Sequence, residues 1–131
     1  MANKIIQLKD GNDNLYPSSF NGTWSPQIYD YETLKLTLTN AGEYIRIGSL
    51  AVFSFNVRID TAITFNTMLQ IRGFPFSVRI FGGNMYCAGT ATNFAERTIQ
   101  YAVNAVYLRP NFTGTMGSGY WWSGMFIGII A

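Results

Sequence analysis

The segment from Gly42 to Asp60 constrains the fold more than any other part of the chain. It contains two apolar runs joined at Gly48 and Ser49, a pair typical of a tight turn. In the second run, polar residues separate four apolar ones, which are Phe53, Phe55, Val57 and Ile59. Successive side chains of a β-strand point to opposite faces, so this run has one apolar and one polar face. The segment therefore predicts a half-buried hairpin in an antiparallel sheet.

The same alternation recurs at residues 34–38, 76–80 and 99–103. Turn residues separate these runs about every eight to twelve positions, and no window shows the 3.6-residue period of a helix. We expect about ten short strands and no helix of note. The sequence thus predicts an all-β protein, an antiparallel β-sandwich of jelly-roll type.

The chain has 131 residues, 48% of them hydrophobic, which is enough for one domain with a packed core. A dense turn signal at residues 10–14 separates the first apolar segment from the rest. We interpret residues 1–20 as an N-terminal arm or connector and residues 21–131 as the β-sandwich head domain. The alternative is that residues 1–20 supply the first strand of the same domain.

Charge and targeting signals narrow the class of protein. The formal net charge is only +2, and no basic run follows the spacing of a phosphate backbone, which argues against a nucleic-acid partner. The N-terminus lacks the apolar run of a secretory signal, and the apolar tail is far shorter than the roughly 20 residues that span a bilayer. We expect a soluble protein, made in a cytoplasm and not inserted in a membrane.

Few residues are suited to catalysis. The chain has no histidine and a single cysteine, Cys87, so neither an intrachain disulfide nor a metal cluster is supported, and we expect no cofactor. Cys87 falls in an alternating run, as a small core residue would. Asp30 and Glu32 are the only close carboxylate pair at a possible strand edge, and we interpret them as solvated turn residues and not as an acid/base pair. The sequence predicts a protein that is not an enzyme.

The last apolar run breaks the alternation, because it is apolar at both even and odd positions. An antiparallel strand that is apolar on both faces needs a cover on each. A loop or the N-terminal arm is one possible cover, and a second copy of the chain is the other. We favour an oligomer interface formed by four residues of this strand: Phe126, Ile127, Ile129 and Ile130.

The most ligand-like cluster is the aromatic triplet Tyr120, Trp121 and Trp122, which follows a loop rich in glycine and serine. The C–H face of a sugar stacks on an aromatic ring, while charged and amide side chains bond its hydroxyls. Because neighbouring strand residues face opposite ways, one of the two tryptophans should be in the core and one outside. Arg72, Arg97 and Arg109 lie at strand ends or loop edges, where they can join such a receptor-binding surface or serve only solubility.

Several segments, in order, resemble the C-terminal head domains of tailed-bacteriophage receptor-binding proteins and tail fibres. They are Gly-Thr-Trp-Ser-Pro at 22–26, Gly-Glu-Tyr-Ile-Arg-Ile-Gly-Ser-Leu-Ala-Val-Phe-Ser-Phe at 42–55, Arg-Gly-Phe-Pro-Phe at 72–76, Val-Tyr-Leu-Arg at 106–109 and the apolar closing strand. The resemblance covers about residues 22–131. These motifs belong to the scaffold of the family's heads, so no receptor-site residue transfers from them. The chain lacks the collagen-like or coiled stalk of longer fibres.

The resemblance implies a homotrimeric virion protein at the tip of a phage tail, assembled in the host cytoplasm beside other tail or virion proteins. It would bind a host-surface glycan or protein without cleaving it. One alternative is a capsid or tail decoration protein with a purely structural role. A small glycan-degrading enzyme is a third class, against which the absence of histidine counts.

Overall fold

The computed structural model describes residues 7–9, 15–17, 19–87, 98–109, 111 and 113–130, with side chains from residue 21 onward. These residues form fourteen β-strands, β1 to β14, and every pairing between them is antiparallel. Among them there is no helix, and hence none that could cross a membrane. The all-β class expected from the alternation is confirmed.

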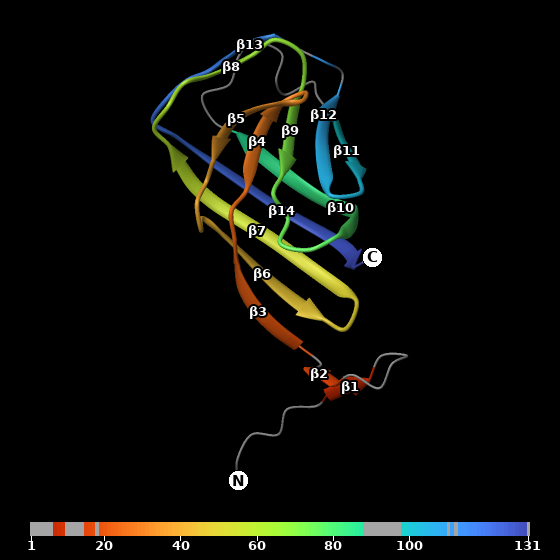
Figure 1. Ribbon diagram of the computed structural model, residues 1–131. Coiled ribbons are helices and arrows are strands. Elements are labelled where there is room, and N and C mark those ends of the chain that lie inside the picture. Colours follow the sequence, from red (N-terminus) through yellow and green to blue (C-terminus); the bar gives the residue numbers. More distant parts are fainter. Residues whose placement is uncertain are drawn as a thin grey trace.

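Two five-stranded sheets make up most of the fold (Figure 1). The first, which we call the β7 sheet, has the strand order β10 (Val78–Cys87), β14 (Tyr120–Ile130), β7 (Leu50–Ile59), β6 (Gly42–Ile47) and β3 (Ser19–Trp24). The second, the β9 sheet, has the order β11 (Thr98–Ala102), β12 (Ala105–Arg109), β9 (Leu69–Arg72), β4 (Gln27–Asp30) and β5 (Thr33–Thr37). In Figure 1 the short strands of the β9 sheet cross in front of the long strands of the β7 sheet. The result is a β-sandwich-like fold.

Two pairs of short strands complete the fold. β8 (Ile63–Phe65) pairs with β13 (Gly114–Met116) at one end of the sandwich, seen at the top of Figure 1. β1 (Gln7–Lys9) pairs with β2 (Leu15–Pro17) near the N-terminus, in a separate two-stranded sheet. These short strands raise the number above the ten expected. The separate β1–β2 sheet lies within residues 1–20, the expected N-terminal arm. The first strand of the β7 sheet, β3, starts at Ser19 and so begins inside that segment. That residues 1–20 act as a connector stays a prediction.

The core lies between the two large sheets. In β7 the alternate residues Ala51, Phe53, Phe55 and Ile59 are buried, whereas Asn56 and Arg58 are exposed. The expected assignment of faces in this strand is therefore confirmed. Burial of large apolar side chains, each worth about 1.5–3 kcal/mol, drives the packing of the two sheets.

Aromatic rings fill the centre of the core around Trp24. The Trp24 ring stacks on Phe74, with ring centroids 4.9 Å apart, and meets Phe53 edge-on at 5.7 Å. Its Nε1 donates hydrogen bonds to the backbone carbonyls of Glu43 and Ser54, both at 3.1 Å. Phe74 belongs to the Gly-Phe-Pro-Phe loop between β9 and β10, so this loop packs into the core beside β3 and β7.

Asn104 joins the two sheets along one edge. Its backbone N–H donates to the Val78 carbonyl, and its side-chain Oδ1 accepts from the Val78 N–H, both at 2.8 Å. Asn104 has φ 58°, a left-handed conformation that asparagine tolerates better than most residues. Nearby, the Tyr101 hydroxyl donates to the Gly83 carbonyl at 2.7 Å. The sandwich is closed by these bonds at the β10–β11 edge.

One strand departs from the expected pattern. Leu38 is buried and Leu36 half-buried, but Leu34 is exposed at 47%. The pairing of β5 with β4 shifts between Ile28 and Tyr29, so that Leu34 lies opposite Tyr29 and away from the core. Such bulges are common on edge strands, where they interrupt a row of unpaired backbone groups that could otherwise pair with another chain. The alternation at residues 34–38 therefore marks the core face at Leu36 and Leu38 but not at Leu34.

Candidate functional site

The structure separates the residues that the sequence grouped as a receptor site. Tyr120 and Trp121 are exposed at 48% and 56%, at the start of β14 in the β7 sheet. Arg72 ends β9 in the other sheet. Arg97 lies outside the described residues. The expected single surface therefore splits into at least two regions.

Trp122 and Phe126 belong to the core and not to a binding surface or an interface. Trp122 is only 1% exposed, and its Nε1 finds no hydrogen-bond partner in the part of the chain that the structure describes. The expectation of one tryptophan inside and one outside is confirmed. Phe126 is fully buried, with its ring 6.2 Å from Phe74. Both side chains point inward because they share the inner face of β14 with Gly124 and Gly128.

The outer face of the β7 sheet carries aliphatic side chains in register. Ile47, Leu50 and Ile129 lie opposite one another across β6, β7 and β14, and Ile45, Val52 and Ile127 form the next row. Ile45 and Ile47 are more than half exposed, at 52% and 56%, and Met125 is half exposed, at 50%. We call these seven residues the aliphatic face: Ile45, Ile47, Leu50, Val52, Met125, Ile127 and Ile129.

The expected interface residues fall on two sides of β14. Ile127 and Ile129 lie on the aliphatic face, where an interface can form. Ile130 is half-buried and packs against the core, beside Val78 in the register. The strand is apolar at both parities because one parity faces the core and the other faces outward.

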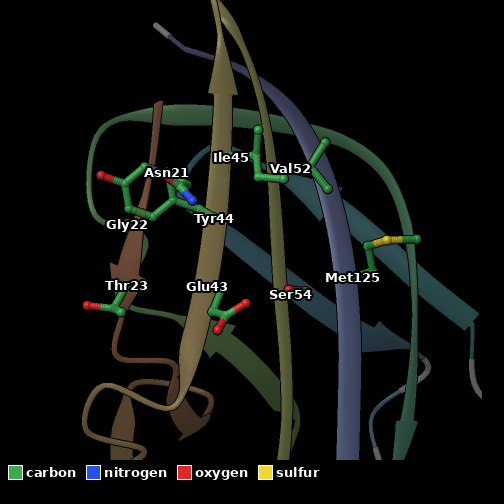
Figure 2. Close-up of a pocket in the computed structure, with 9 residues that line it drawn as sticks. All are labelled: Asn21, Gly22, Thr23, Glu43, Tyr44, Ile45, Val52, Ser54 and Met125. Atoms are coloured by element: carbon green, nitrogen blue, oxygen red, sulfur yellow. The ribbon is translucent and has the colours of Figure 1, made fainter. Parts of the chain in front are cut away.

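A shallow hollow of about 500 Å³ lies at one margin of the aliphatic face (Figure 2). Figure 2 shows Ile45 and Val52 side by side on neighbouring strands, with Met125 beyond them and the polar Thr23 and Glu43 toward the β3 edge. Gly22 shapes this edge, because a Cβ there would come within 2.8 Å of the Tyr44 ring. The hollow thus has an apolar floor and a polar margin.

A second cleft, of about 320 Å³, lies on the outer face of the β9 sheet around Arg72. One row of side chains crosses this face in register: Tyr29 on β4, Gln70 on β9, Tyr107 on β12 and Gln100 on β11. We call the cleft the Arg72 cleft; its lining residues are Tyr31, Glu32, Met68, Gln70, Arg72, Gln100, Tyr107 and Arg109. Tyrosine, amide, guanidinium and carboxylate groups therefore meet in one depression.

Neutral groups hold the guanidinium of Arg72 in place. Its Nε and Nη2 donate to Gln70 Oε1 at 2.9 and 2.6 Å, and Nη2 also donates to the Tyr31 carbonyl at 3.2 Å. The guanidinium carbon lies 4.4 Å from the centre of the Tyr29 ring, in cation–π geometry. Gln70 is only 2% exposed, and its amide nitrogen contacts the Met68 sulfur at 3.8 Å. These contacts fix the position of the Arg72 guanidinium.

Tyr31 enters the cleft from a turn built by Asp30. The carboxylate of Asp30 accepts hydrogen bonds from the backbone N–H groups of Asn66, Thr67 and Met68 at 2.8–3.0 Å. The Tyr31 N–H donates to the Met68 carbonyl at 2.8 Å, and Tyr31 has φ 54°. A bulky residue in this left-handed region is an outlier that the surrounding contacts must hold.

Asp30 is not the solvated turn residue that the sequence indicated, since it is only 7% exposed. Burial raises the pKa of its carboxyl. The combined effect of the hydrogen bonds from Asn66, Met68 and Thr67 and of the Lys35 charge is larger and opposite, so the pKa of Asp30 lies below its usual value. Glu32 is exposed, as expected. The two carboxylates therefore differ: the Asp30 carboxylate accepts hydrogen bonds from three backbone N–H groups, whereas Glu32 faces solvent.

The described residues offer little for nucleophilic or metal chemistry. Cys87 is 2% exposed, and burial raises the pKa of its thiol far above the usual value, so the expectation of a core cysteine is confirmed. Within the described ranges, no three histidine, cysteine, aspartate or glutamate residues come together as a metal site.

Sequence reasoning named two residues of this cleft, Arg72 and Arg109, but not the tyrosine and glutamine side chains around them. Gln70 and Arg72 have the same parity in β9, and Tyr107 and Arg109 have the same parity in β12. Residues of the same parity in a strand point to the same face, so the sequence did indicate that each of these two pairs shares a face. The pairing of β9 with β12 and with β4, which brings the strands side by side, cannot be read from either strand alone.

No known protein family matches this sequence, and no curated protein or solved structure is significantly similar to it.

Proposed function

We propose that this protein is a non-catalytic virion protein of a tailed bacteriophage, and that it binds a host-surface receptor, a saccharide, as a trimeric head at the tail tip. The resemblance of its motifs to phage head domains supports the phage setting. The proposal includes a jelly-roll arrangement of the two sheets. The strand order is compatible with it, because strands that are far apart in the chain lie side by side in both sheets.

The observation that carries the proposal is the difference between the two outer faces of the sandwich. The β7 sheet presents the aliphatic face, and the β9 sheet presents the Arg72 cleft. An extended apolar surface on a soluble protein is typical of a contact with another chain. A depression lined by tyrosine, arginine and amide groups is typical of a site for polar ligands. One face thus supports assembly and the other supports recognition.

Assembly would strengthen weak recognition. Three copies on one fibre present three sites to the same cell surface, and linked sites bind with an effective concentration that multiplies the affinity of each. A closed ring of copies also hides the aliphatic face without leaving an open end. The trimer itself comes from the family resemblance, because the pattern of the face does not count subunits.

The test is binding of fluorescently labelled protein to a panel of bacterial strains, with and without periodate oxidation of the cells. Periodate cleaves vicinal diols of glycans and leaves most surface proteins intact. We expect binding to a subset of strains and its loss after oxidation. Binding that survives oxidation would point to a protein receptor, and binding to no strain would contradict the receptor-binding function.

The aliphatic face also fits a second function, that of a capsid or tail decoration protein with a structural role only. Such a protein needs one surface for its neighbours and no ligand site. It would bind purified phage particles that lack it, and it would leave host cells unlabelled in the same assay.

A further inference from the structure

We propose that the Arg72 cleft is the saccharide site and that it selects an acidic sugar, whose carboxylate pairs with Arg72 and Arg109. This inference rests on the proposed function, and it names the ligand class and the place. Tyr31 and Tyr107 would contact the faces of the sugar rings, and Gln100 and Glu32 would bond hydroxyl groups. The aromatic end of β14, with Tyr120 and Trp121, is then not the saccharide site.

The charge of Arg72 is the first argument. The partners found for its guanidinium are an amide oxygen, a backbone carbonyl and a tyrosine ring, none of which carries a negative charge. Its Nη1 has no hydrogen-bond partner among the described residues. By contrast, Arg58 on the other sheet pairs with Asp60 at 2.9 Å. A guanidinium that is held firmly but not neutralised attracts an anion, and the two N–H groups of Nη1 are left to donate charge-assisted hydrogen bonds to a carboxylate.

Arg109 and Glu32 set the charge balance of the cleft. Arg109 is exposed in the same depression, and the described part of the chain gives it no ion-pair partner. Glu32 contributes the one carboxylate of the lining. Two guanidinium groups and one carboxylate leave one net positive charge. A sugar with one carboxylate suits this balance, whereas a densely sulfated or phosphorylated chain would meet repulsion from Glu32.

The rigidity of the cleft is the second argument. Gln70 is a buried polar side chain whose amide oxygen accepts two of the three hydrogen bonds from Arg72, so it fixes the orientation of the guanidinium. The backbone of Tyr31 is held by Met68 on one side and by Arg72 on the other. A site that is ordered before binding loses less entropy when the ligand arrives. The strained conformation of Tyr31 is typical of a residue kept in place for a functional contact.

Size and shape favour one or two sugar rings. The volume of about 320 Å³ is at the lower end of small-molecule sites. The cleft is open on the outer face of a sheet, so a longer glycan can continue beyond it on either side. Apart from Met68, every lining side chain carries a polar group, which does not suit a lipid chain.

The test uses the full-length protein labelled with ¹⁵N and two probes that differ only at one group, methyl glucuronide and methyl glucoside. We expect the acidic sugar to shift the Arg72 Nε–H signal and the amide signals of Tyr31 and Tyr107. The neutral sugar should bind at least about tenfold more weakly, because it lacks the charge-assisted hydrogen bonds. The Arg58 Nε–H and the Trp121 indole signals serve as internal controls and should not move.

Variants separate the roles of charge and geometry. Arg72→Gln should weaken binding of methyl glucuronide by about tenfold or more. Arg72→Lys retains the charge but loses the planar guanidinium that Gln70 and Tyr31 hold in place, so its affinity should fall between those of the wild type and Arg72→Gln. Tyr31→Gly accepts the left-handed turn and removes only the ring, so it should keep the thermal midpoint while lowering affinity. Arg58→Gln, which removes an equal charge elsewhere, is the matched control and should bind as the wild type does.

Three outcomes would overturn the inference: equal binding of both sugars, no shift with either sugar, or shifts centred on Trp121 in place of Arg72. A third probe, glucose 6-sulfate, decides the nature of the anion, and stronger binding of the sulfate would overturn the choice of carboxylate. Each of these results leaves the proposed function standing if periodate still abolishes binding to cells. Conversely, selective binding of methyl glucuronide with no binding to any strain would contradict the function and not the site.

Discussion

The indole ring of Trp24 occupies the space into which a side chain at Gly42 would project. The two residues are direct partners in the pairing of β3 with β6. A Cβ on Gly42 would come within 2.7 Å of the Trp24 atom Cε2. Because Gly42 has no side chain, the indole can lie flat over β6, where its Nε1 reaches the carbonyls of Glu43 and Ser54.

The first prediction concerns this pair. Gly42→Ala should lower the free energy of unfolding by about 1–3 kcal/mol, because the ring must move away from its stacking and hydrogen-bond partners. Gly82→Ala is the matched control, since its added methyl group would meet only the Cγ2 methyl group of Ile127, at 3.1 Å, which is a much looser approach than that of Trp24 to Gly42. Urea denaturation measures both variants. An equal loss in the two would show that Trp24 does not depend on Gly42.

The second prediction concerns the faces of β7. Phe53→Ala and Phe55→Ala should each cost about 3–5 kcal/mol in urea denaturation, since both rings are packed inside the core. Asn56→Ala, at an exposed position of the same strand, should change stability by less than about 0.5 kcal/mol. A large loss for Asn56 together with a small loss for Phe55 would mean that the strand is rotated by one residue.

The third prediction concerns the buried carboxylate of Asp30. Its pKa is lower in the folded chain than in the unfolded chain, where the value is about 3.9, so the ionised form stabilises the fold at neutral pH. This contribution is present above the unfolded pKa and is lost as the pH falls through the folded pKa.

Asp30→Asn should therefore cost about 1–3 kcal/mol at pH 7, because an amide offers one acceptor oxygen where the backbone donors use two. The cost should shrink as the pH falls below about 4. Thermal midpoints of both proteins between pH 7 and pH 2.5 measure the difference. A cost that is the same at every pH would show that the charge of Asp30 contributes nothing.

The fourth prediction concerns assembly. We expect sedimentation at micromolar concentration to report about three chains per particle, as the proposed trimeric head requires. Ile45→Lys and Ile127→Lys, which place a charge on the aliphatic face, should shift the protein toward monomer while it stays folded. Thr37→Lys, at an exposed position of the other sheet, should leave the assembly unchanged. A wild-type monomer would contradict the interface.

Phe126→Lys provides a different readout. Its side chain is in the core, so the added charge should unfold the monomer and not merely separate the subunits. Circular dichroism distinguishes the two effects. A folded monomeric variant would place Phe126 at the interface after all.

The sequence alone determined the class of fold and the inner face of its central strand. Alternation with a period of two is a local property, and it identified Phe53, Phe55 and Ile59 as core residues. It also separated Trp121 from Trp122, because adjacent strand positions face opposite ways.

Only the tertiary structure decided which strands lie side by side. The bulge that turns Leu34 outward depends on the pairing of β5 with β4, and the burial of Asp30 depends on a loop 36 to 38 residues away in the chain. The Arg72 cleft needs β4, β9, β12 and β11 in register, so that Tyr29, Gln70 and Tyr107 form one row. Contacts between residues far apart in the sequence form because each sheet must bury its apolar face against the other, and no single strand contains that information.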